Sequence, residues 1–131
     1  MKPVVVFIVD KNPIHSSLLK YYLTLHRYFQ VQLYHSAEEC LYRLRKNITP
    51  DYLITEYDLH DHNGFDFLRM AKQLSPSTEV LFFSTYDDPI LAMRLIDAGA
   101  TDYIMKTAKL EHGIQDLIKN IEFIHKERIH T

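Results

Sequence analysis

The stretch YLITEYDLHDHNG, residues 52–64, decides the fold. Its first four residues form a short apolar run that predicts a β-strand, and the acidic residue Glu56 follows this run. A polar loop comes next and closes at Gly64. In sheets of parallel strands, ligand-binding and catalytic groups lie where the strands end. The stretch therefore predicts a strand that places a carboxylate at the functional edge of a sheet.

Four more segments have strand character. Most are nearly continuous apolar runs rich in β-branched and aromatic residues, which is typical of strands buried on both faces of a parallel sheet. One of them alternates apolar and polar residues instead, so we expect it at an edge of the sheet. The segments are VVVFIV (4–9), the alternating QVQLYH (30–35), VLFFS (80–84) and YIM (103–105).

Segments with helical spacing separate these strands. Pro13 suits a first helical turn, and Ser36 with Glu39 forms a capping box. Asp88 stands as an N-cap before Pro89, and the next glycine stops that helix about ten residues later. The predicted helices are 13–29, 36–46, 65–74, 89–98 and 109–127.

Apolar stripes show which side of each helix faces the core. In the first helix the predicted core face carries Leu18, Tyr22, Leu25 and Phe29. The last helix has a longer stripe that also predicts core packing. Its members are Leu110, Ile114, Leu117, Ile118, Ile121 and Ile124.

Strict alternation of strand and helix predicts an α/β fold. The pattern indicates a doubly wound five-stranded parallel sheet with helices on both faces, a flavodoxin-like arrangement. The carboxyl ends of the strands then share one edge. We expect one shallow pocket there, lined by Asp10, Lys11, Glu56, Ser84 and Lys106.

Length and composition exclude several classes of protein. A chain of 131 residues predicts a single domain, 1–131, with a core over about 4–124. The net charge of −2 has no basic footprint for nucleic acid, and no apolar run is long enough to cross a membrane. Cys40 is the single cysteine, so we expect a small buried side chain in a reducing, cytoplasmic setting.

The motifs at this edge resemble the receiver domain of two-component response regulators, the fold of the bacterial chemotaxis response regulator. The resemblance covers residues 4 to about 124 and implies a role in phosphorelay signal transduction. It also implies protein partners that bind the face formed by the fourth helix, fifth strand and fifth helix. The motifs are FIVD at the first strand, LITEYDLHDHNGFDFL, VLFFSTYDDP and AGATDYIMK, in this order.

The resemblance assigns roles to individual positions, and two departures stand out. The family's phosphoacceptor aspartate falls on Glu56, and the second residue of its acidic magnesium pair falls on Lys11. The other matching positions are the first acid of that pair, Asp10, the phosphate-contacting hydroxyl, Ser84, the switch aromatic, Tyr103, and the lysine of the fifth strand, Lys106. Asp58 is a further acid of this pocket.

These departures predict a pseudo-receiver that neither binds Mg²⁺ well nor accepts phosphate. An ammonium at Lys11 takes the place of the ion, and the longer side chain of Glu56 moves the attacking oxygen by roughly 1 Å. We expect Glu56 to reach toward Lys106 and Lys11, with Ser84 turned to the pocket and Tyr103 inward. Such a domain acts by protein–protein interaction and is not an enzyme.

Other hypotheses remain open at this point. A working receiver would accept phosphate on another acid, with Asp58 and Asp61 the nearest candidates. An enzyme on the same fold is a third hypothesis, although no glycine-rich phosphate loop is present. The loop histidines His60 and His62 fit solvated side chains better than a metal site.

Overall fold

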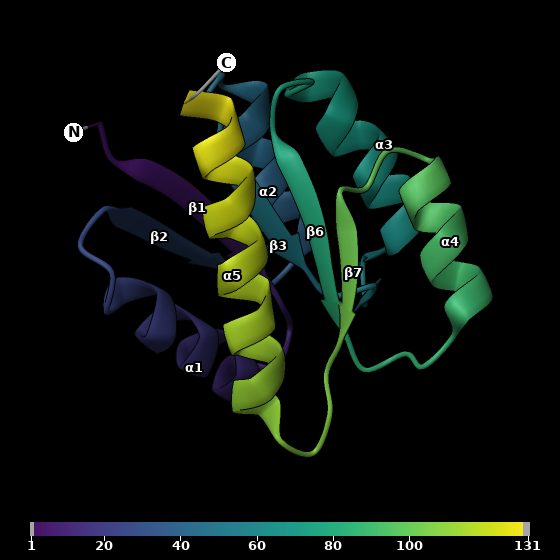
Figure 1. Ribbon diagram of the computed structural model, residues 1–131. Helices are drawn as coiled ribbons and strands as arrows, with labels where there is room; N and C mark the ends of the chain where they lie inside the picture. Colours follow the sequence, from purple (N-terminus) through teal and green to yellow (C-terminus); the bar gives the residue numbers. More distant parts are fainter. Residues whose placement is uncertain (1, 130–131) are drawn as a thin grey trace.

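The computed structural model describes residues 2–129. Its main sheet has five parallel strands in the order β2-β1-β3-β6-β7, as predicted for a doubly wound fold (Figure 1). The alternating segment lies at an edge, also as predicted, because β2 pairs with β1 alone. The strands are β1 (Val4–Val9), β2 (Phe29–Tyr34), β3 (Tyr52–Thr55), β6 (Glu79–Ser84) and β7 (Asp102–Met105).

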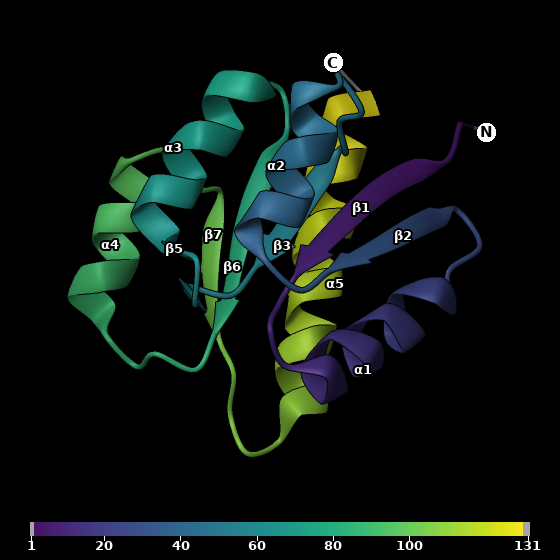
Figure 2. The same ribbon diagram turned by 180° about the vertical axis from the view of Figure 1, so that it is seen from behind.

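Five helices cover the two faces of the sheet. One face carries α1 (Pro13–Thr24) and α5 (Leu110–Ile129), in front of the sheet in Figure 1. The other face carries α2 (Ala37–Arg45), α3 (Gly64–Leu74) and α4 (Pro89–Asp97), seen from behind in Figure 2. The apolar stripe predicted for the last helix is in the core: Ile114, Leu117, Ile118 and Ile121 are buried.

The predicted helix starts depend on capping hydrogen bonds. Asn12 Oδ1 accepts from the backbone N–H groups of Ile14 and His15 at the start of α1. Ser36 Oγ accepts from the N–H of Glu39, as in a capping box. The Glu39 side chain accepts in return from the N–H of His35, one residue before the N-cap, through Oε2. Asp88 caps α4 in the predicted way, by accepting from Ile90 N–H and Leu91 N–H.

The prediction for α1 was wrong at its C-terminal end. The helix ends at Thr24, and Phe29 opens β2 in register with Val4. Leu25, predicted to face the core, is 61% exposed. The buried side chains of α1 are Ser16, Leu19 and Leu23.

The loop after β3 contains a small antiparallel hairpin that the sequence analysis did not predict. Its strands are β4 (Asp58–Leu59) and β5 (His62–Asn63). His60 turns the chain with a positive φ of 37°, and Leu59 is buried. The hairpin therefore fixes the side chains that follow Glu56.

Candidate functional site

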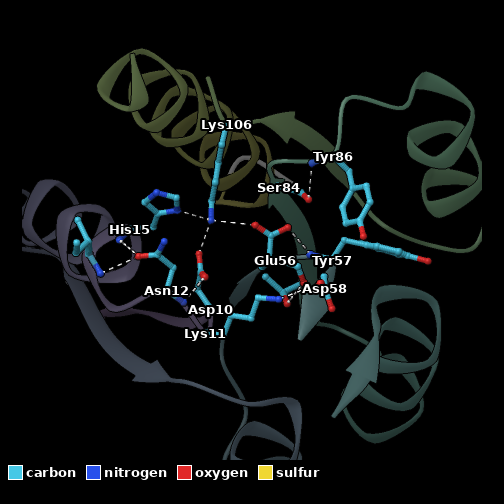
Figure 3. Close-up of polar contacts among 12 residues, drawn as sticks. Asp10, Lys11, Asn12, His15, Glu56, Tyr57, Asp58, Ser84, Tyr86 and Lys106 are labelled. Carbon is cyan, nitrogen blue, oxygen red and sulfur yellow. Dashed lines mark hydrogen bonds and ion pairs between the residues drawn. The ribbon is translucent and has the colours of Figure 1, made fainter. Parts of the chain in front are cut away.

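Three strand ends bring one buried ion cluster together. Asp10 follows β1, Glu56 follows β3 and Lys106 follows β7. Lys106 Nζ donates to Asp10 Oδ2 over 2.6 Å and to Glu56 Oε2 over 3.0 Å (Figure 3). None of the three residues is more than 7% exposed. The ammonium thus binds two carboxylates away from bulk water, and we call these residues the Asp10–Glu56–Lys106 cluster.

The remaining carboxylate oxygens accept backbone hydrogen bonds. Asp10 Oδ1 accepts from the N–H of Asn12 over 2.9 Å, at the N-terminal end of α1. Glu56 Oε1 accepts from the N–H of Tyr57 over 2.8 Å. These N–H groups stabilise negative charge, and the helix N-terminus adds its partial positive charge. The cluster is therefore compensated even though it holds one more carboxylate than ammonium.

His15 also contacts Lys106, a contact that the sequence analysis did not predict. Its Nδ1 lies 3.0 Å from Lys106 Nζ. Burial and the nearby Lys106 ammonium lower the pKa of His15 below its ordinary value. A neutral ring whose Nδ1 accepts from Lys106 fits both observations. The sequence could have pointed to His15, because it stands in the first turn of the predicted helix that follows the strand-end residue Asp10.

Lys11 contradicts one part of the prediction. Its Nζ pairs with Asp58 Oδ2 over 2.9 Å and does not contact Glu56. The side chains of this pair are 31% and 54% exposed. The hydrogen bond from Lys11 lowers the pKa of Asp58. Asp58 belongs to the hairpin and pairs with Lys11, whereas Glu56 pairs with Lys106.

Asp61 and the loop histidines lie away from the cluster. Asp61 accepts from the N–H groups of Ala37 and Glu38, so its carboxylate caps the start of α2. His62 Nε2 contacts Glu38 Oε1 over 3.0 Å. Among residues 2–129, no three histidine, cysteine, aspartate or glutamate side chains are grouped as metal ligands would be.

Ser84 and Tyr103 hold the loop between β6 and α4. Ser84 Oγ, fully buried, accepts from the N–H of Tyr86 over 3.2 Å. Tyr103 donates its hydroxyl to the carbonyl of Tyr86 over 2.6 Å and stacks on Phe82 with ring centroids 6.2 Å apart. Burial raises the pKa of Tyr103.

The sequence analysis expected Tyr103 to lie inward and Ser84 to turn toward the pocket. Tyr103 lies inward as predicted, half-buried against the core. The Ser84 hydroxyl accepts from the loop backbone at Tyr86, and its expected turn toward the pocket stays a prediction.

With this geometry in view, comparisons with known proteins decide the family. Residues 6–118 match the response regulator receiver domain. The chain belongs to this family. It is 27% identical over 132 aligned residues to the Fimbriae Z protein of Escherichia coli K12, covering 98% of this chain and 63% of that protein. It is 31% identical over 117 residues to the sensory transduction protein LytT of Bacillus anthracis, covering 87% of this chain and 46% of that protein.

Solved structures agree on the receiver fold. A CheY-like receiver domain protein from Methanospirillum hungatei superposes with a TM-score of 0.80 at 21% identity, covering 96% of this chain and 99% of that one. The response regulator domain of Thermotoga maritima CheB gives a TM-score of 0.82 at 17% identity, with 92% and 95% covered. The chain spans between 44% and 63% of the length of the first curated relatives it matches.

Receiver domains imply a magnesium site, and the residues at this edge do not fit one. Mg²⁺ needs open carboxylate and carbonyl oxygens in octahedral geometry. Here one oxygen of Asp10 and one of Glu56 bind the Lys106 ammonium, and the other two accept backbone N–H groups. The second family position carries the ammonium of Lys11. No chemical step of this domain is therefore assigned to a metal.

The helices also bear on membrane insertion. Within residues 2–129, no helix is both long enough and apolar enough to span a lipid bilayer.

Proposed function

We propose that this receiver domain acts in two-component signalling without being phosphorylated, as a module that binds other proteins in the cytoplasm. The observation that carries the proposal is the Asp10–Glu56–Lys106 cluster. In it, the lysine that would meet a phosphoryl group already binds two carboxylates. We also propose that residues 1–131 work as one domain, with Glu56, Lys11 and Asp58 as the altered positions of its pocket. Receiver domains are typically signalling modules rather than enzymes.

The state of Glu56 supports this proposal. Phosphoryl transfer needs a free oxygen in line with the donor and cations that neutralise the developing charge. Both oxygens of Glu56 accept hydrogen bonds, and the residue is 5% exposed. Attack on a donor would first require Glu56 to leave Lys106, so the barrier to transfer rises.

The same contacts support a single resting conformation. Glu56 holds Lys106, and Ser84 and Tyr103 both bind the loop at Tyr86. We propose that the carboxylate of Glu56 replaces the charge that a phosphoryl group would bring. The inward Tyr103 then persists without a signal, and the domain does not switch.

We propose the face formed by α4, β7 and α5 as the partner surface. Ile90 and Met93 of α4 are 65% and 66% exposed, and Phe123 of α5 is 66% exposed. Tyr103 lies between these helices on β7. Exposed apolar side chains of this size are typical of interaction surfaces. A phosphate-independent domain would present this face at all times.

Treatment with acetyl phosphate and Mg²⁺, followed by intact-mass spectrometry, tests the proposal. We expect no mass gain. A stoichiometric gain of one phosphoryl group would overturn it, and peptide mapping would then identify the acceptor. Asp58 is the carboxylate to examine first, because it is exposed beside Lys11. Asp61 is a weaker candidate because its carboxylate caps α2.

A further inference from the structure

Strand β2 forms an unprotected edge of the main sheet. It pairs with β1 on one side, and within residues 2–129 no strand pairs with its other side. Natural proteins protect such edges with charged residues, proline, bulges or very short strands, because an unpaired edge readily joins another strand. The sequence of β2 is FQVQLY, and none of its six residues is charged, a proline or a glycine.

The opposite edge of the sheet, β7, is better protected. This strand has four residues, and the first of them is the charged Asp102. The carboxylate of Asp102 accepts from the N–H of Tyr103, and the charged Lys106 follows the strand directly. The edge that remains open to a further strand is therefore β2.

The backbone groups that β2 leaves free follow from its pairing with β1. The carbonyl groups of Tyr28 and Tyr34 both accept hydrogen bonds from the β1 side. Since backbone groups of successive residues in a strand point to opposite edges, every second residue between these two also faces β1. Val31 and Leu33 thus direct their N–H and C=O groups outward. Phe29 directs its C=O outward, while its N–H donates within the preceding turn.

These free groups are self-complementary about Val31. When two antiparallel strands meet, opposite residues whose groups face each other exchange both hydrogen bonds. With Val31 opposite Val31 of another copy, these two residues exchange both bonds, and Leu33 N–H reaches the C=O of Phe29 in the other copy. The same register places the exposed Gln30 opposite Gln32. The apolar side chains of both strands then lie together on the core side.

The charges beside the two ends of β2 match in this register. Arg27 lies two residues before the strand, and Glu39 lies beside its other end, where Oε2 accepts from the N–H of His35. Arg27 and Glu39 are exposed, and in the part of the chain that the structure describes neither has an ion-pair partner. A two-fold axis at Val31 brings the start of one β2 beside the end of the other, so Arg27 of each copy comes near Glu39 of the other. This complementarity favours a second copy as the occupant of the edge.

We propose that β2 is an interface between two copies of this chain, joined edge to edge in antiparallel register about Val31. The main sheets of the two copies then form one continuous sheet. This goes beyond the proposed function, because β2 lies at the other edge of the sheet from β7 and the α4–β7–α5 face (Figure 1). A dimer of this kind presents one such face at each of its ends.

The length of β2 sets the expected strength of the dimer. Its six residues span about 20 Å. So short a contact buries less area than a standard stable interface, and we expect a dimer that forms only as the concentration rises. Sedimentation velocity of the whole chain over a concentration series tests this. Hydrogen exchange followed by NMR should show the amide protons of Val31 and Leu33 protected in the dimer and not in the monomer.

Substitution of the exposed glutamines tests the register without touching the core. Gln30→Lys with Gln32→Lys places like charges opposite each other and should weaken the dimer by about tenfold or more. Gln30→Glu with Gln32→Lys places opposite charges there and should retain the dimer. The matched control, Gln73→Lys with Gln115→Lys, adds the same charge at exposed positions of α3 and α5 and should leave the dimer unchanged. Amide spectra of each variant show that it is folded.

Several results would overturn the β2 interface. A chain that stays monomeric up to about 1 mM would do so, as would a dimer that Gln30→Lys with Gln32→Lys leaves intact. Equal weakening by the Gln30→Glu, Gln32→Lys variant would reject the register about Val31. Equal weakening in the Gln73→Lys, Gln115→Lys control would show that net charge, and not β2, decides association. Phosphate labelling does not bear on any of these outcomes, so this inference and the proposed function fail independently.

Discussion

Replacing Lys106 with methionine removes the one cation that binds both buried carboxylates. Asp10 and Glu56 lie 2.6 Å and 3.0 Å from its ammonium and are each 5% exposed. Methionine keeps much of the volume of lysine but supplies neither charge nor hydrogen-bond donors. The variant therefore leaves two carboxylates facing each other with only backbone N–H groups as partners.

The size of the effect follows from burial. Removing one partner of a buried ion pair destabilises a protein by about 3–5 kcal/mol, because the remaining charge has lost its compensation. We expect a loss in this range for Lys106→Met at neutral pH, which is a large part of the stability of a domain this size.

Urea unfolding followed by far-UV circular dichroism measures this loss. The control is Lys11→Met, which removes the exposed pair with Asp58 and should cost at most about 1 kcal/mol. Lys106→Met combined with Glu56→Gln should recover part of the stability, because one buried charge is removed with its partner. Equal losses in Lys106→Met and Lys11→Met would refute the view that the buried cluster is a strongly coupled charge site.

The shifted pKa values of His15 and Cys40 lead to two further predictions. The folded-state pKa of His15 is lowered, so the unfolded chain takes up its proton first as pH falls below the ordinary value of 6.5, and stability decreases from there downward. His15→Gln should flatten this part of the curve of unfolding free energy against pH, and an unchanged slope would contradict it. Burial raises the pKa of Cys40 to about 12, so iodoacetamide should leave the native protein unmodified at neutral pH and label it in urea. Rapid labelling of the native protein would show that Cys40 is accessible.

The sequence predicted the sheet well because burial on both faces leaves a direct trace. Strand β1 is a continuous apolar run, β6 is apolar from Val80 to Phe83, and nearly all side chains of both strands are buried. The ends of helices were harder to predict from the sequence. Leu25 and Phe29 continue the helical spacing of α1, but Phe29 belongs to β2, where its backbone pairs with β1. Strand pairing between distant segments outweighed the local pattern.

The site was predicted as a set of residues but not as a set of contacts. Strand ends supplied Asp10, Glu56 and Lys106, and the expected ion pair of Glu56 with Lys106 is present. The contact of His15 with Lys106 joins residues 91 positions apart, and it depends on how α1 lies over the edge of the sheet. The partner of Lys11 depends on an unpredicted hairpin that brings Asp58 beside it. Side-chain pairing at this edge required the three-dimensional arrangement.

Restoring the family residues tests the central claim most directly. The wild-type chain and the double variant Lys11→Asp, Glu56→Asp are treated side by side with acetyl phosphate and Mg²⁺, and their intact masses are compared. Ser84 and Lys106 stay in place in both proteins, and each single variant serves as a control because acceptor and metal ligand act together. We predict a gain of one phosphoryl group in the double variant, much less in either single variant and none in the wild type. Labelling of the wild type, or a folded double variant that stays unlabelled, would contradict the claim that Glu56 and Lys11 make this domain independent of phosphate.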